Sequence, residues 1–165
     1  MRHAKGFTLI ELLIVVALIL IIAAMAIPSL TSAKMNANEA SAVASIRAIN
    51  QVEVQYLSAY GGYAPSLANL GGAEPCAKSA ATACLLDQSL AGGVKSGYNF
   101  VATGTNPADA LSTGYIVAAA PVVFDRTGKR TFCSTDKGVI RADLNAGGSV
   151  TPPTAEQCTG FAALQ

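Results

Sequence analysis

The sequence predicts an α+β fold in which one long N-terminal helix packs on a small antiparallel β-sheet. Three observations lead to this expectation. A long apolar run opens the chain, a second stretch without glycine or proline keeps a helical repeat, and the C-terminal half alternates β-rich segments with turn residues. The chain has 165 residues, enough for one domain with a modest core but not for two.

Composition excludes several classes of protein. Hydrophobic residues make up 52% and charged residues 13%, about half the usual charged share, which is the reverse of a disordered chain. A net charge of +1 without a basic cluster argues against nucleic acid as a direct partner. With His3 as the one histidine, a histidine-ligated metal site or a Ser-His-Asp hydrolase is hard to build, so we expect no enzyme, metal or cofactor.

The N-terminal apolar run is long enough to cross a membrane. Residues 12–27 are all apolar, and extension back to Phe7 meets only Thr8 and Glu11, whereas a bilayer core needs roughly 20 apolar residues as a helix. A cleaved secretory signal fits poorly, because the run is too long and Pro28 closely follows the small residues that would form its cleavage site. A plain membrane anchor leaves Glu11 unexplained unless its carboxylate reaches water at the membrane edge.

The segment Lys5–Leu12 resembles the processing signal of type IV prepilins and of type II secretion pseudopilins. The resemblance covers about the first 30 residues. It implies that prepilin peptidase removes residues 1–6 by cleavage between Gly6 and Phe7 and methylates the new amino group of Phe7. It also implies that Glu11 is the acid typical of the class, and Pro28 stands where these helices commonly carry a proline. The short leader resembles that of type IVa major pilins.

This resemblance also implies a role for Glu11 and Phe7 in assembly. In an apolar filament core a lone carboxylate and a lone ammonium group are each costly. Pairing of Glu11 with the Phe7 amine of a neighbouring subunit would offset both costs. Removal of one partner of such a buried pair costs about 3–5 kcal/mol, so we expect the pair to act as a docking and register device, together with Pro28 in the assembling helix.

The helical pattern continues beyond Pro28. Residues 31–60 contain no glycine or proline, and apolar residues recur there at steps of three or four. We therefore predict one helix from about Thr8 to Tyr60, with a kink or local opening at Pro28 left open, ended by Gly61 and Gly62. The charged residues Glu39, Arg47 and Glu53 are expected among polar neighbours. The tyrosines at and just beyond the end of this helix are assigned to packing: Tyr56, Tyr60 and Tyr63.

Residues 63–165 are expected to form the head. A loop-rich stretch from Tyr63 to Gly93 contains a short helical turn at Ser66–Leu70. Three to five antiparallel strands should follow and cover the apolar stripe of the helix, which the resemblance identifies as the αβ-roll of pilins. The candidate strands are Tyr98–Ala102, Tyr115–Ala119, Val122–Asp125, Arg130–Ser134 and Gly138–Ala142. The expected divisions are thus a leader 1–6, a membrane and filament-core helix 7–28, an amphipathic continuation 29–62 and a head 63–165.

Four cysteines lie beyond the helix: Cys76, Cys84, Cys133 and Cys158. Three pairings are possible, and proximity favours Cys76–Cys84 and Cys133–Cys158. The second pair resembles the disulfide-bounded C-terminal region of type IV pilins. The spacings lack a CxxC pair, which argues against zinc or redox chemistry, and Asp125, Asp136 and Asp143 are too sparse for a calcium loop.

The resemblance implies a structural subunit of an extracellular type IV pilus. Its implied partners are further copies of the chain in a helical homopolymer, prepilin peptidase, an assembly platform with its ATPase, and the bacterial inner membrane before assembly. A pseudopilin of a type II secretion system and a minor pilin remain alternatives. A membrane-anchored exported enzyme or binding module is a third, which no nucleophile–base pair or phosphate loop in the sequence supports.

Overall fold

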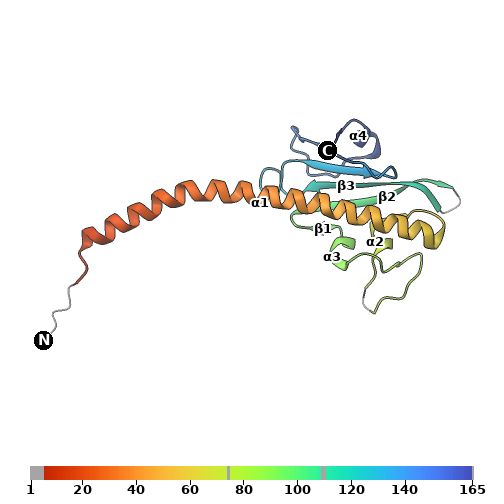
Figure 1. Cartoon of the computed structure of the whole chain (residues 1–165), viewed down its shortest axis with the longest axis horizontal. Coiled ribbons are helices and arrows are strands. Elements are labelled where there is room, and N and C mark those ends of the chain that lie inside the picture. Colours follow the sequence, from red (N-terminus) through yellow and green to blue (C-terminus); the bar gives the residue numbers. More distant parts are fainter. Residues whose placement is uncertain (1–5, 74, 109–110, 165) are drawn as a thin grey trace. The chain divides into compact units, whose positions relative to one another are not determined.

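A computed structural model describes residues 6–73, 75–108 and 111–164 (Figure 1). The chain divides into two compact units, Met1–Lys34 and Met35–Gln165. Helix α1 extends over Leu9–Tyr60 and contributes to both units, which confirms the single long helix expected from about Thr8 to Tyr60. The α+β fold class is confirmed as well, because the second unit combines this helix with an antiparallel sheet.

In the first unit, α1 is not interrupted at Pro28. A proline inside a helix removes one backbone hydrogen bond. Close to this position, the Thr31 hydroxyl donates a hydrogen bond to the Ile27 carbonyl oxygen, at 3.1 Å. Side-chain back-bonding of this kind is common in helices.

In the second unit, one face of α1 is buried. Ala42, Ile46 and Ile49 are fully inaccessible to solvent, at the spacing of three and four residues that places side chains on one helix face. Helix α1 ends before Gly61, whose φ of +80° is a conformation that glycine adopts without strain. The backbone N–H of Gly61 still donates to the Leu57 carbonyl oxygen, at 2.9 Å, and the expected glycine stop is confirmed.

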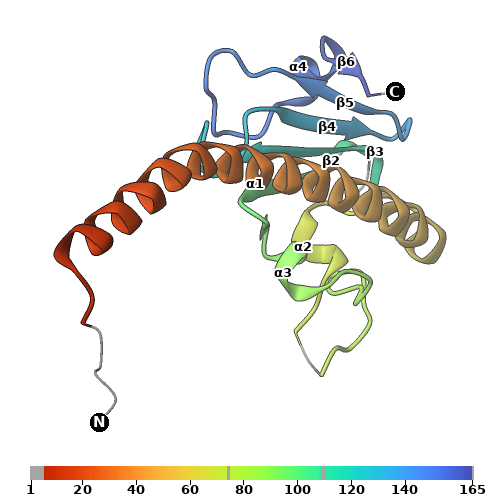
Figure 2. The same cartoon turned by 60° about the vertical axis from the view of Figure 1, so that its left-hand side comes forward.

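Within the described residues, the sheet has six antiparallel strands in the order of the sequence, β1-β2-β3-β4-β5-β6 (Figure 2). Each strand therefore pairs with its neighbours along the chain. The long central hairpin of β2 and β3 lies alongside the C-terminal half of α1 in both views. The strands are β1 (Val94–Lys95), β2 (Tyr98–Ala108), β3 (Leu111–Pro121), β4 (Thr131–Thr135), β5 (Ile140–Asp143) and β6 (Ala162–Ala163).

The expected strand Val122–Asp125 is wrong. Strand β3 instead runs to Pro121 and ends there, since proline lacks the N–H that a ladder needs. Phe124 forms only an isolated bridge with Gly128, and Asp125 has a φ of +59° that belongs to a turn. The expected maximum of five strands is also too low, because the two-residue strands β1 and β6 carry no readable alternation.

In the part of the chain that the structure describes, three short helices accompany the sheet: α2 (Leu67–Leu70), α3 (Gln88–Ala91) and α4 (Ala155–Thr159). The first matches the expected helical turn, α3 lies in the stretch expected to be rich in loops, and α4 was not predicted. Both of these carry a side-chain cap. Asp87 accepts a hydrogen bond from the Leu90 N–H at 3.0 Å, and Thr154 forms a capping box with Gln157, a sequence pattern that marks helix starts.

Hydrophobic packing lies on both faces of the sheet. The larger cluster fills the space between α1 and the face of the sheet that packs against it, which we call the inner face. Tyr98, Val117 and Phe132 are its central side chains. A smaller cluster on the other face contains Ile116, Ala118 and the bonded pair Cys133 and Cys158. The tyrosines belong to the larger cluster: Tyr56 is buried, Tyr60 and Tyr63 are partly buried, and the ring pairs Tyr56–Tyr60 and Tyr63–Tyr115 have centroids 4.6 and 4.8 Å apart. Their assignment to packing is confirmed.

Candidate processing and assembly site

The predicted processing residues are contiguous at the start of the first unit. Gly6 and Phe7 precede α1 in a segment without regular structure. A Cβ atom added at Gly6 would meet no other atom within 4 Å, and the Phe7 side chain is 82% exposed. The peptide bond between them is therefore not shielded by packing within this unit, and the glycine is not required by packing there.

Glu11 is bound by the residue that caps the helix. The Thr8 backbone N–H and the Thr8 hydroxyl both donate to Glu11 Oε2, at 2.9 and 2.7 Å. In return, the Glu11 N–H donates to Thr8 Oγ1, at 3.3 Å. This is a capping box, in which the first residue and the third helical residue satisfy each other's backbone donors. Its Thr-x-x-Glu signal is readable in the sequence, and it gives Glu11 a role in starting α1 that does not depend on a partner chain.

The capping box leaves Glu11 with capacity for a second partner. Both contacts from Thr8 use Oε2, and an ionised carboxylate can accept further hydrogen bonds on its other oxygen. Pro28 stands apart from this cluster, because it lies seventeen positions further along the helix than Glu11, a rise of about 25 Å. The structure thus joins Glu11 to Thr8, a residue that the sequence analysis did not single out, and places Gly6 and Phe7 directly before this capping box.

The apolar side chains of the first unit are exposed. Residues 7–34 are all solvent-accessible apart from the half-buried Ala23, and Leu9, Met25 and Leu30 are each more than 70% exposed. Of the helices described, α1 is the one long and apolar enough to cross a membrane. A continuous apolar surface of this kind marks a site for membrane or protein contact.

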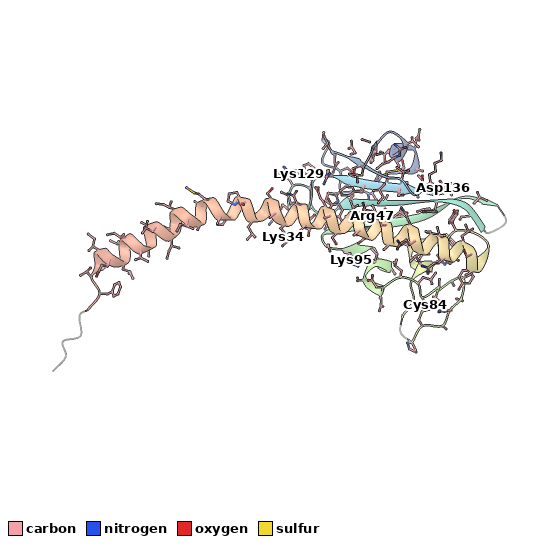
Figure 3. All side chains as sticks on the ribbon, viewed as in Figure 1. Lys34, Arg47, Cys84, Lys95, Lys129 and Asp136 are labelled. Atoms are coloured by element: carbon pink, nitrogen blue, oxygen red, sulfur yellow. A yellow bond between two sulfur atoms is a disulfide. The ribbon has the colours of Figure 1, made fainter. Side chains whose placement is uncertain are left out.

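The first acid of the second unit corrects an expectation. Glu39 was expected among polar neighbours, yet only 5% of it is exposed. Its Oε1 accepts hydrogen bonds from the backbone N–H groups of Lys129 and Arg130, at 2.9 and 3.1 Å, and its Oε2 accepts from Arg130 Nε, at 2.7 Å. Burial acts to raise the pKa of Glu39, but these two N–H groups and the guanidinium outweigh it and hold the pKa below its ordinary value. In Figure 3, Lys129 marks the loop that binds Glu39.

The expectation for Glu53 is also wrong. This residue was expected among polar neighbours, but it is completely buried. Its Oε2 accepts a hydrogen bond from the Ala64 N–H, at 3.0 Å, and its Oε1 has no hydrogen-bond partner among the described residues. Burial raises the pKa of Glu53 to about 7, although the Ala64 N–H acts in the opposite direction. Arg47, by contrast, is exposed.

Two disulfides hold parts of the head. Cys76 is bonded to Cys84 and Cys133 to Cys158, with Cα atoms 6.1 and 5.9 Å apart, which are the pairs that proximity favours. The second bond attaches α4 to β4 on the outer face of the sheet. The aspartates considered for calcium take part in local contacts: Asp125 pairs with Lys129 at 2.9 Å, and Asp143 accepts from the Asn145 N–H at 2.7 Å.

Comparison with known proteins supports the assignment of the N-terminal segment. Residues 1–27 match the family described as the prokaryotic N-terminal methylation motif. A stretch of 39 residues is 64% identical to the type IV wide pilus major component PilA4 of Thermus thermophilus. Over this stretch the chain is similar to a type IV pilus component.

The similarity to the Thermus protein covers a limited part of each chain. The alignment with the Thermus protein includes 24% of this chain and 30% of the relative, and no solved structure matches the chain. The match to the methylation motif ends at residue 27.

Proposed function

We propose that the chain is a structural subunit of an extracellular type IV pilus. The observation that carries this proposal is that residues 1–27 match the N-terminal methylation motif and open a helix whose apolar side chains are exposed as far as residue 34. The similarity to a major pilus component points in the same direction. A type II secretion pseudopilin shares the N-terminal motif, but neither similarity favours it over a pilin.

In the proposed maturation, prepilin peptidase cleaves between Gly6 and Phe7 and methylates the Phe7 amino group. The exposed and irregular backbone at these residues supports access for the enzyme. Loss of Arg2 and Lys5 with the leader changes the formal net charge from +1 to −1. The mature chain keeps the whole apolar helix.

Before assembly, the mature subunit is held in the bacterial inner membrane by residues 7–28. An assembly platform with a cytoplasmic ATPase then transfers it into a helical homopolymer, where the apolar surfaces of neighbouring helices cover one another. Burial of apolar surface stabilises by roughly 25 cal/mol per Å², so many exposed leucine and isoleucine side chains supply a large cohesive term. Residues 35–165 would form the outer surface of the filament.

Glu11 guides docking in this proposal. Its Oε2 remains with the Thr8 cap, and its Oε1 receives the Phe7 ammonium group of the neighbouring subunit. The helix therefore keeps its capping box while the carboxylate gains a charged partner. A subunit that docks out of register leaves both charges buried and unpaired, which is the costly state.

The test is to shear filaments from intact cells and to measure the mass of the subunit before and after reduction. We expect a mass that lacks residues 1–6, carries one methyl group and increases on reduction by the hydrogens of two disulfides. Recovery of the processed chain from the inner membrane but never from sheared filaments would favour the pseudopilin. An uncleaved chain, or one cut elsewhere, would overturn the proposed maturation.

A further inference from the structure

A buried carboxylate without a cation lies close to the end of α1. Glu53 is fully buried, and its Oε2 binds the Ala64 N–H just beyond the turn that ends the helix. Its Oε1 lacks a hydrogen-bond partner within residues 6–73, 75–108 and 111–164. A buried carboxylate oxygen left unpaired is unfavourable when the group is ionised, whereas a protonated carboxyl group avoids most of that penalty.

The neighbouring hydroxyl groups are engaged elsewhere. The Tyr56 hydroxyl donates to the Ala80 carbonyl oxygen at 2.7 Å, and the Tyr115 hydroxyl donates to Asn50 Oδ1 at 3.2 Å. The ion pairs formed by described residues involve other acids than Glu53. Neither a tyrosine proton nor a cation is therefore supplied to Glu53, and a proton of its own is the remaining way to neutralise it.

The titratable groups around Glu53 change little near neutral pH. Tyr56 and Tyr115 interact with it electrostatically, and their rings pack against Tyr60 and Tyr63. Burial raises the pKa of both Tyr56 and Tyr115 further above their ordinary value of 10.0, so both stay neutral. Asp136 adds negative charge near Tyr115. Burial places the pKa of Glu53 itself at about 7.

The Glu53 contact joins α1 to a segment that is otherwise bound to the sheet. The Tyr63 N–H donates to the Ser112 carbonyl oxygen at 2.9 Å, and the Gly104 N–H donates to the Pro65 carbonyl oxygen at 3.2 Å. Residues 63–65 are thus attached to β3 and β2 by their main chain. On the other side, Glu53 attaches the same residues to the helix through the Ala64 N–H.

We propose that Glu53 is a proton-controlled latch, a contact that holds residues 63–65 to α1 while its carboxyl group is protonated and loosens when the proton leaves. In the proton transfer, the O–H bond at Oε1 breaks and the proton passes to water. The carboxylate that remains is negative and buried, and it is stabilised by a single N–H. Hydration of this charge requires water to enter between the helix end and residues 63–65.

The sign of the pH dependence follows from the raised pKa. An unfolded chain ionises Glu53 near 4.5, whereas the folded chain keeps its proton up to about pH 7. The contribution of Glu53 to stability is therefore complete below pH 4.5 and is lost as pH rises through about 7. One proton gives about a tenfold increase in the unfolding equilibrium constant for each pH unit in this window.

The experiment uses the full mature chain in detergent micelles, from about pH 5 to about pH 8. Hydrogen exchange of the Ala64 amide, corrected for the intrinsic rate at each pH, reports local opening, and urea unfolding reports the head as a whole. For the wild-type chain we expect protection of Ala64 to fall by about a hundredfold over this range. The Glu53→Gln variant, which cannot ionise, should lose this dependence.

Glu39→Gln is the matched control, because Glu39 is also a buried carboxylate of α1 but has Arg130 as its partner. It should lower stability while it keeps the wild-type pH dependence between about pH 5 and about pH 8, a range in which Glu39 stays ionised. A flat profile for the wild-type chain, or an unchanged pH slope in Glu53→Gln, would overturn the latch. If Glu53→Gln fails to fold, the carboxyl ¹³C resonance of Glu53 in the wild-type chain decides: a midpoint near 7 supports the latch, and one near 4.5 refutes it.

Discussion

The two halves of α1 use apolar side chains in opposite ways. Residues 9–34 are almost all apolar, yet Leu18, Ile19 and Ile22 are more than half exposed. Residues 35–60 are far more polar, yet Ile46 and Ile49 are completely buried by the sheet. The half with the greater hydrophobicity thus has the least burial within its own chain. This difference indicates that the first half is built for contacts that another molecule or a membrane provides.

The carboxylates of the helix show the same division. Glu11 belongs to an exposed capping box, whereas Glu39 and Glu53 are buried and bind main-chain N–H groups of the head. Only Glu39 has a cation as well. Substitution of each acid therefore tests a different property: Glu11 tests assembly, Glu39 tests the attachment of the head, and Glu53 tests the response to pH.

The largest effect is expected from Glu11→Leu. This change removes the carboxylate that the proposed filament core pairs with Phe7, and the loss of one partner of a buried pair costs about 3–5 kcal/mol per subunit. We expect no sheared filaments, with the processed chain still in the inner membrane. Glu156→Gln, at an exposed position of α4, is the control and should assemble normally. Filaments of wild-type yield from Glu11→Leu would contradict the docking role.

The next prediction contrasts Ile49→Ala with Ile19→Ala. Ile49 is buried under the sheet and Ile19 is exposed in the first unit. Truncation of a buried isoleucine costs about 2–5 kcal/mol, so Ile49→Ala should lower the unfolding free energy of the mature chain in micelles by that amount. Ile19→Ala should leave it unchanged and instead weaken the filament, measured by its dissociation in detergent. A similar loss of unfolding free energy in both variants would show that the halves do not differ as described.

The two disulfides should contribute unequally to stability. The loop closed by Cys133–Cys158 spans 25 residues and that closed by Cys76–Cys84 spans 8. The chain-entropy relation gives about 3.5 kcal/mol for the longer loop and about 2.5 kcal/mol for the shorter one. Urea unfolding of the Cys133→Ser/Cys158→Ser and Cys76→Ser/Cys84→Ser variants measures both. A larger loss of unfolding free energy in Cys76→Ser/Cys84→Ser than in Cys133→Ser/Cys158→Ser would refute this ranking.

The smallest effect is expected from Glu39→Gln, because the amide oxygen can still accept from the N–H groups of Lys129 and Arg130, whereas the amide nitrogen cannot accept from Arg130 Nε. Hydrogen bonds to a charged group contribute about 1.5–3 kcal/mol, so we expect a loss within that range at neutral pH. Because the pKa of Glu39 is lowered on folding, its contribution is present above pH 4.5 and disappears as pH falls below that value. Urea unfolding at about pH 3 and about pH 7 should therefore show a difference between variant and wild type only at the higher pH.

Sequence patterns predicted the long elements well and the short ones poorly. Helix α1 was readable because its repeat extends over many turns and Gly61 ends it. Strands β1 and β6 have two residues each, too few for any alternation to show. The strand wrongly placed at Val122–Asp125 has β-branched residues, but Pro121 ends the ladder before them. Helix α4 was missed although its Thr-x-x-Gln cap was visible.

The polar contacts of the core were missed for a different reason. Glu39 and Glu53 lie on the same helical face as Ile46 and Ile49, at spacings of seven, three, and four residues. That position is a readable signal of burial. Their partners, however, are main-chain N–H groups of residues 64, 129 and 130. Every residue except proline has such a group, so no side-chain pattern can identify which ones are used.

The attachment of Glu39 has an evolutionary consequence. Its Oε1 accepts hydrogen bonds only from the backbone N–H groups of residues 129 and 130. The Lys129 side chain extends away into solvent. Descendant sequences can therefore exchange the amino acid at 129 for almost any other without losing the anchor beneath it, proline being the exception. The side chain at position 129 can therefore change the surface of this loop without changing the contact between its backbone and Glu39.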